Sequence, residues 1–140
     1  MSWGISGTGE GEFTLLHNVD IDSQDRVYIC DRQIDRIQIF DYDGNFMQSW
    51  EALHDPGGVH CDRENFVYVC GQGGGGRDNG FSIFTESGEL VSRVHRPYEK
   101  RHPQPHGICI DSKGNVYLAQ LPAKQKADMD HKVSKYVKIR

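Results

Sequence analysis

Short apolar runs rich in β-branched and aromatic residues alternate along the chain with clusters of Asp, Asn, Ser and Gly. Val27–Cys30 and Ile37–Phe40 are typical of these runs. Runs of this kind, bounded by turn-forming residues, predict the strands of an antiparallel meander. Asp43-Gly44 and Ser87-Gly88 predict tight hairpins, because glycine accepts the positive φ that such turns require. Helical periodicity is weak; its best case, over 124–132, we interpret as an insertion loop.

This pattern occurs three times, over 16–50, 56–94 and 105–140. Equivalent positions follow at offsets of 40 and 49 residues, near the period of propeller blades. They include Asp22, Asp62 and Asp111, then Tyr28, Tyr68 and Tyr117, then Cys30, Cys70 and Ala119. We therefore predict an all-β propeller-type fold with about three four-stranded antiparallel blades, at approximately 7–50, 51–94 and 95–140, the third without a fourth strand.

Composition supports this fold class and excludes others. Val and Ile together number 20 against 10 for Ala and Leu, which is a β-type composition. A length of 140 residues suffices for one domain with a modest core, and a net charge of −4 with ordinary apolar content argues against disorder. No apolar run approaches the roughly 20 residues of a membrane-spanning helix, and the first residues lack the pattern of a signal peptide.

Four cysteines invite a disulfide or zinc interpretation, but no C-x-x-C pair is present. Each lies in a strand-like stretch, where cysteine behaves as a small buried apolar residue; they are Cys30, Cys61, Cys70 and Cys109. We therefore expect reduced thiols and, as a corollary, a cytoplasmic location.

The repeat resembles the NHL family. GTGEGEF at 7–13 matches the family's glycine-glycine-phenylalanine lead-in, HNVDID and VYICDR match its first two strands, and RIQIFDYDG matches its third strand and turn. Within this family the chain resembles peptidyl-α-hydroxyglycine amidating lyase and its bacterial relatives. This second resemblance rests on Leu16-His17-Asn18, Cys30-Asp31-Arg32-Gln33 and Pro105-His106-Gly107. It implies a six-bladed ring with a zinc-assisted lyase site and a small peptide-like substrate.

His17 and His106 are the first candidate site residues. They occupy one column of the first and third repeats, where the second repeat has Gly57. The residue that opens the innermost strand of a propeller faces the central channel, so two such histidines can converge on one metal ion. The lyase resemblance implies zinc ligands at this column; the alternative is a pair of ordinary polar channel residues. A calcium site is not expected, because the family's aspartate after the last histidine is Gly107 here.

Arg32 is the candidate for substrate binding. The resemblance places it where the lyases have an arginine that handles the substrate carboxylate, and a guanidinium fork suits that task. The alternative is a surface arginine paired with Asp31 or Asp35. Arg36 occupies a position where the repeat has a structural arginine.

The length sets a limit on these expectations. An NHL propeller needs about six blades to close, and just under three are present. We expect either the C-terminal part of a longer protein or self-association of two copies into one ring. The third zinc histidine and the catalytic tyrosine that the resemblance implies would then lie in missing blades, and the catalytic residues stay unknown.

Two function classes follow from the sequence. The first is a lyase-like propeller that cleaves a peptidyl-α-hydroxyglycine to an amide and glyoxylate. The alternative is a non-catalytic NHL scaffold for protein–protein interaction. RNA binding is the weaker form of this alternative: residues 1–94 carry 6 basic and 16 acidic side chains (net −10) and residues 95–140 carry 10 and 4 (net +6), so the basic charge is local.

Overall fold

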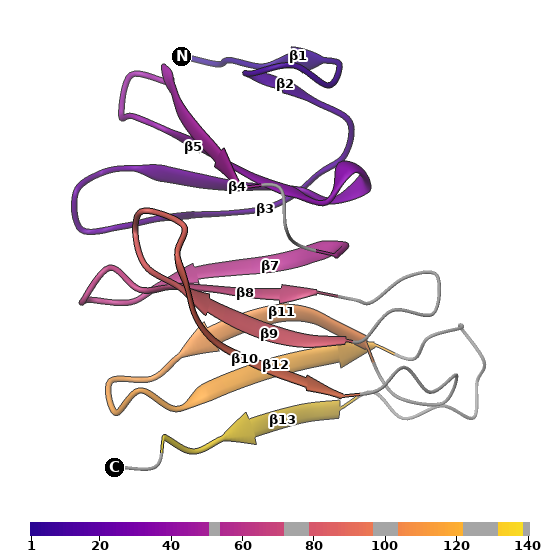
Figure 1. Cartoon of the computed structure of the whole chain (residues 1–140), viewed down its shortest axis with the longest axis vertical. Coiled ribbons are helices and arrows are strands. Elements are labelled where there is room, and N and C mark those ends of the chain that lie inside the picture. Colours follow the sequence, from indigo (N-terminus) through magenta and orange to yellow (C-terminus); the bar gives the residue numbers. More distant parts are fainter. Residues whose placement is uncertain (51–53, 72–78, 97–103, 122–131, 139–140) are drawn as a thin grey trace.

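Three antiparallel β-sheets follow one another along the chain in a computed structural model that describes residues 1–50, 54–71, 79–96, 104–121 and 132–138 (Figure 1). Blade 1 contains β3 (Leu16–Ile21), β4 (Val27–Asp31), β5 (Arg36–Phe40) and β6 (Phe46–Trp50). Blade 2 contains β7 (Pro56–Cys61), β8 (Val67–Gly71), β9 (Asn79–Phe84) and β10 (Leu90–Arg96). Blade 3 contains β11 (Gln104–Ile110), β12 (Val116–Leu121) and β13 (Lys132–Tyr136).

Strand order within each sheet is the order along the chain, and all pairs within the blades are antiparallel. The all-β, propeller-type prediction is therefore confirmed, and in the described residues blade 3 has three strands. A 3₁₀ turn, η1 (Arg32–Ile34), joins β4 to β5. The insertion loop predicted over 124–132 lies outside the described residues except for Lys132, which begins β13.

The lead-in segment forms a small parallel pair, β1 (Ile5–Ser6) with β2 (Glu12–Phe13), at the N-terminal end of the stack (Figure 1). The Arg36 guanidinium donates to the carbonyl oxygens of Thr8, Gly9 and Glu12 at 2.7–3.0 Å. The Gln38 amide also donates to the Glu12 carbonyl, at 2.7 Å. Arg36 is therefore structural, as predicted.

The three inner hairpin turns share one pattern of hydrogen bonds. In the inner hairpins the Asp22, Asp62 and Asp111 carboxylates each accept from the backbone N–H groups two and four residues later, at 2.9–3.0 Å. The fourth residue of each turn has positive φ, and so do Gly44 and Gly88 in the outer hairpins. The predicted glycine turns are confirmed, and aspartate or asparagine takes the same conformation at Asp25 and Asn65.

Aromatic and aliphatic side chains form the cores between the blades. Tyr28, Trp50 and Phe84 pack together between blades 1 and 2, with ring centroids 5.5–5.8 Å apart. Phe81 of blade 2 meets Tyr136 of blade 3 at 5.2 Å. A blade cannot bury both faces of its own sheet, so these contacts are what hold the stack together.

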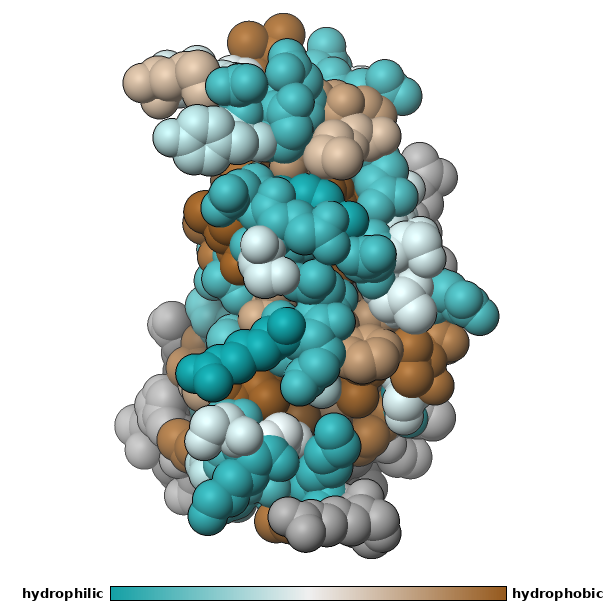
Figure 2. Space-filling model, turned by 90° about the vertical axis from the view of Figure 1, so that its left-hand side faces the viewer, coloured by the Kyte–Doolittle hydropathy of each residue, from teal (hydrophilic) through white to brown (hydrophobic). Residues whose placement is uncertain are grey.

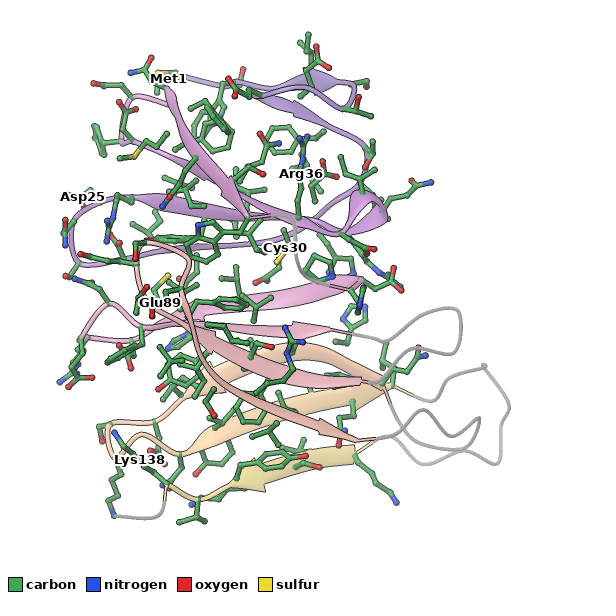
Figure 3. All side chains as sticks on the ribbon, viewed as in Figure 1. Met1, Asp25, Cys30, Arg36, Glu89 and Lys138 are labelled. Carbon is green, nitrogen blue, oxygen red and sulfur yellow. The ribbon has the colours of Figure 1, made fainter. Side chains whose placement is uncertain are left out.

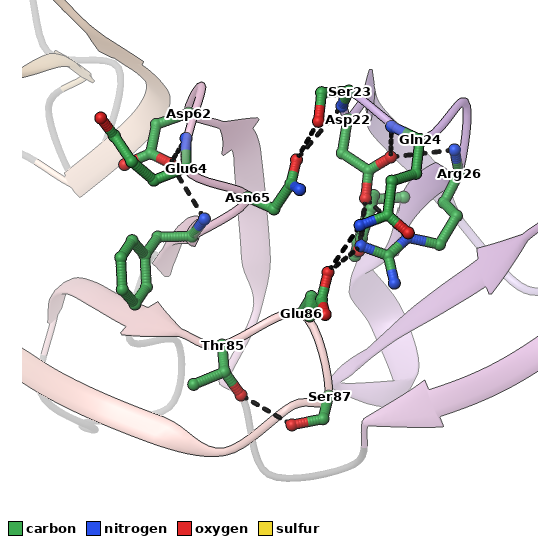
Figure 4. A network of polar contacts seen from close by, with 12 residues as sticks. Asp22, Ser23, Gln24, Arg26, Asp62, Glu64, Asn65, Thr85, Glu86 and Ser87 are labelled. Atoms are coloured by element: carbon green, nitrogen blue, oxygen red, sulfur yellow. Dashed lines mark hydrogen bonds and ion pairs between the residues drawn. The ribbon is translucent and has the colours of Figure 1, made fainter.

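Polar side chains join the hairpin turns of blades 1 and 2 along one side of the stack, on the left in Figure 1 (Figure 4). Arg26 lies 2.6 Å from both the Asp22 and the Glu86 carboxylates. Ser23 Oγ donates to Asn65 Oδ1 at 2.8 Å. The surface on this side of the molecule is largely hydrophilic (Figure 2).

The cysteines are all free, but they are not all buried. Cys30 and Cys70 are fully buried, and burial raises the pKa of the Cys70 thiol to about 12. Cys61 is partly buried, whereas Cys109 is exposed, contrary to prediction. The reason is strand alternation: Ile108 and Ile110 pack toward blade 2, so Cys109 points to the opposite face of β11.

In the described part of the chain, no helix is long and apolar enough to cross a membrane.

Candidate functional site

The site is built on the first strand of each blade. β7 neighbours both β3 and β11, so the three innermost strands lie side by side. Asn18 Oδ1 accepts from the Val59 N–H at 2.9 Å, and Asp20 Oδ2 accepts from the Cys61 N–H at 2.8 Å. These side chains of β3 therefore satisfy the backbone of β7, which has no strand ladder on that side.

Each innermost strand carries a β-bulge at the same repeat position. In β3, Leu16 pairs with Asp31 and Asn18 with Cys30, so His17 is the extra residue. The same shift between Pro56 and Gly58 makes Gly57 the extra residue of β7. In β11 it falls between Pro105 and Gly107, on His106. A bulge re-aims the side chain of its extra residue, and bulges are common beside functional sites.

The two predicted histidines meet. The His17 and His106 rings lie with centroids 4.7 Å apart and planes inclined at 62°. His17 Nδ1 lies 2.6 Å from the Gly57 carbonyl oxygen. A carbonyl can only accept, so this hydrogen bond assigns the proton to Nδ1, and the neutral ring keeps a lone pair on Nε2.

Arg32 lies at the same end of the blades. It follows β4 directly, its side chain is half-buried, and its backbone N–H donates to the Leu15 carbonyl at 3.0 Å, one residue before β3. Burial lowers the pKa of His106, and electrostatic interactions with His17 and Arg32 lower it further. Of the three predicted residues, His17 and Arg32 therefore both act electrostatically on His106.

Asp31 supports the strand that carries His17, a role that the sequence did not single out. Its fully buried carboxylate accepts from the N–H groups of Thr14 and Leu15 at 3.0 and 2.9 Å, and it pairs with Arg36 at 3.1 Å (Figure 3 labels Arg36). Burial acts to raise its pKa, but these hydrogen bonds and the ion pair outweigh burial and lower it. Asp31 fixes the segment that enters β3 and thereby places His17.

Imidazole nitrogen binds zinc well, so the spacing of the histidine pair can be compared with that of two imidazoles on one zinc ion. Two imidazoles that share a tetrahedral zinc at ordinary bond lengths have ring centroids about 5 Å apart. The observed separation of 4.7 Å agrees with this spacing. The Nδ1–H bond from His17 to a backbone carbonyl is also the outer-shell contact that metal-bound histidines commonly make. Among the described residues, no cluster of three or more His, Cys, Asp or Glu side chains is positioned to hold a metal.

Comparison with known proteins supports the repeat family. No family model matches the chain. NHL repeat-containing protein 3 of Homo sapiens is 44% identical over 97% of this chain and 39% of its own length. The Mus musculus protein of the same name is 30% identical over 87% of this chain and 37% of its own. The chain thus spans about two fifths of these relatives, and the matches support an NHL-repeat family.

Solved propeller structures resemble the fold at low sequence identity. A luciferin-regenerating enzyme matches with a TM-score of 0.66 and 12% identity, over 92% of this chain and 47% of that one. A streptogramin B lyase matches with a TM-score of 0.60 and 14% identity, over 89% and 41%. At this identity the likeness shows the fold alone.

Proposed function

We propose that the chain forms part of a lyase-like NHL propeller site, in which His17 and His106 bind zinc and Arg32 binds a carboxylate. The observation that supports this most is the edge-to-face histidine pair, 4.7 Å between centroids, with the charge of Arg32 acting on His106. The sequence resemblance adds the reaction class, cleavage of a peptidyl-α-hydroxyglycine to an amide and glyoxylate.

The reaction fits the chemistry of these residues. The C–N bond of the carbinolamide breaks, the nitrogen gains a proton to give the amide, and the hydroxyl loses its proton as its carbon becomes the aldehyde of glyoxylate. Zinc, when bound, would act as a Lewis acid on that hydroxyl. The planar guanidinium of Arg32 would hold the glyoxylate carboxylate by two parallel hydrogen bonds.

Zinc titration of the purified chain tests the metal part of the proposal. We expect about one zinc per histidine pair, lost in the His17→Ala/His106→Ala variant. His54→Ala is the matched control, because His54 is exposed, outside any strand, and should leave zinc binding unchanged. A well-folded protein that binds no zinc would contradict the proposal.

Glyoxylate binding and release test the ligand part. We expect Arg32→Gln to weaken glyoxylate binding by about tenfold or more, because a charge-assisted fork is lost. If zinc binds but no peptidyl-α-hydroxyglycine is cleaved, the metal is structural in this chain.

A non-catalytic scaffold is the second candidate function. It is supported by the T-shaped contact of His17 and His106, which two imidazoles can also make without a metal, and by the lack of a third metal-ligand side chain beside them among the described residues. In this case the end of the blades that carries His17 and His106 would bind a protein partner.

For both candidate functions, the apolar face of blade 1 needs a covering partner. An apolar groove of about 390 Å³ runs along the free face of blade 1, with Trp3, Phe13 and Val19 in its lining. We propose that further propeller blades or a second copy of the chain cover this face, because an open blade face leaves apolar area in water. The mass of the chain in solution tests this: a stable dimer supports self-association, and aggregation supports a face that further blades would cover. A stable, well-folded monomer would contradict the proposal.

A further inference from the structure

Gly57 lies between the two histidines in the repeat and contacts one of them. We infer that Gly57 is a positioning residue of the histidine site: its carbonyl presents Nε2 of His17, and its missing side chain leaves the third of three equivalent positions without an imidazole. The metal-ligand part of this inference rests on the proposed function; the orientation of His17 does not.

The carbonyl part follows from the bulge in β7. The extra residue of a bulge has no partner across the strand pair, so its backbone groups are available to other contacts. The Gly57 carbonyl uses this freedom to accept from His17 Nδ1 at 2.6 Å, across the gap between blades 1 and 2. Without this acceptor, the two tautomers of a neutral imidazole would compete, and the ring could turn either nitrogen toward His106.

The missing imidazole follows from the equivalence of the three bulges. His17, Gly57 and His106 are each the extra residue of an innermost strand, so the backbone offers three corresponding positions for side chains. Blades 1 and 3 fill theirs with imidazoles, and these rings lie with centroids 4.7 Å apart. Zinc in catalytic sites has three protein ligands and one open position. Gly57, itself buried, supplies no side-chain ligand at the third of these positions.

Nitrogen-15 NMR of the histidine rings tests the carbonyl part without any metal. At a pH where His17 is neutral, we expect the Nδ1–H tautomer for His17, with the chemical shift of Nε2 showing an unprotonated nitrogen. His54, in an exposed bend, provides the reference spectrum in the same sample. A predominant Nε2–H tautomer for His17 would overturn the inference.

A substitution at Gly57 tests the effect of the missing imidazole. We expect Gly57→His to tighten zinc binding by about tenfold or more, because it adds a third imidazole. Gly57→Gln, of similar size but a poor zinc ligand, is the control and should give no such gain. Equal affinities for Gly57→His and Gly57→Gln would overturn the inference.

The results separate this inference from the proposed function. If the native chain does not bind zinc but Gly57→His does, the placement of Gly57 stands and the native metal site is wrong. If the native chain binds zinc and Gly57→His leaves the affinity unchanged, the metal site stands and the role of Gly57 is wrong. The tautomer measurement uses the unmodified chain, so it decides the carbonyl part even if a variant fails to fold.

Discussion

The two contacts between neighbouring blades are built differently, although one repeat supplies both. Between blades 1 and 2, the Asn18 and Asp20 side chains bridge from β3 to the backbone of β7. Between blades 2 and 3, the position equivalent to Asn18 is Gly58, and the strands approach closely: a Cβ there would lie 3.2 Å from Gly107 Cα and from Ile108 N.

This difference shows how a small change in the repeat sets the spacing of the inner strands. A polar side chain keeps two inner strands apart and supplies their hydrogen bonds, whereas glycine lets the backbones meet. With two adjacent glycines, β7 offers little side-chain bulk at the end where His17 and His106 approach each other. The following predictions test this comparison, beginning with the largest expected effect.

Gly58→Ala should cost about 1–3 kcal/mol of unfolding free energy, because the new methyl group overpacks a site bounded by backbone and by Cys70 Sγ at 3.0 Å. Denaturant unfolding measures this. Gly107→Ala is the control, since its nearest neighbour would be Ala119 Cβ at 3.8 Å and the stability should barely change. Equal effects of the two variants would contradict the close approach at Gly58.

Asn18→Ala should cost about 1–2 kcal/mol, because it leaves the buried Val59 N–H without its acceptor. Asn18→Asp keeps an acceptor and should recover part of the loss. If Asn18→Ala is as stable as the native chain, the side-chain bridge between blades 1 and 2 contributes nothing.

Acid should weaken the turn at the edge of blades 1 and 2. Burial acts to raise the pKa of Asp22, but hydrogen bonds from Arg26, Gln24 and Tyr28 outweigh it and lower the pKa below its unfolded value. The stabilisation of the folded state by the ionised Asp22 carboxylate is therefore present at neutral pH and is lost as pH falls below about 4. Asp22→Asn should be less stable at pH 7 and lose less stability in acid; Asp25→Asn, an exposed carboxylate in the same turn, controls for charge. An unchanged acid profile in Asp22→Asn would contradict this assignment.

Glu86→Gln should have the smallest effect, about 0.5 kcal/mol, because the Glu86 side chain is 47% exposed and water screens its pair with Arg26. Raising the salt concentration should reduce the difference between this variant and the native chain. A loss above about 2 kcal/mol would mean that the polar network in Figure 4 carries the blade contact, in place of the inner strands.

Most of the fold could be predicted because its signals are local. Asp22, Asp62 and Asp111 mark the turns, since an aspartate can bond its own backbone two and four residues later. The column of His17 and His106 was also visible, because the repeat aligns them. The bulges were not: β3, β7 and β11 carry no residue pattern that distinguishes a paired residue from an extra one, and register depends on the neighbouring strand.

The sequence by itself determined the class of fold, the three repeats and the residues of the candidate site, since periodicity and turn chemistry are properties of short segments. Only the tertiary structure decided that His17 and His106 meet, that Gly57 bonds one of them, and that Asp31 anchors the strand entry. It also decided that Cys109 faces away from blade 2. These facts depend on how separate strands pack, and contacts between residues 16 to 89 positions apart leave no local trace in a single sequence.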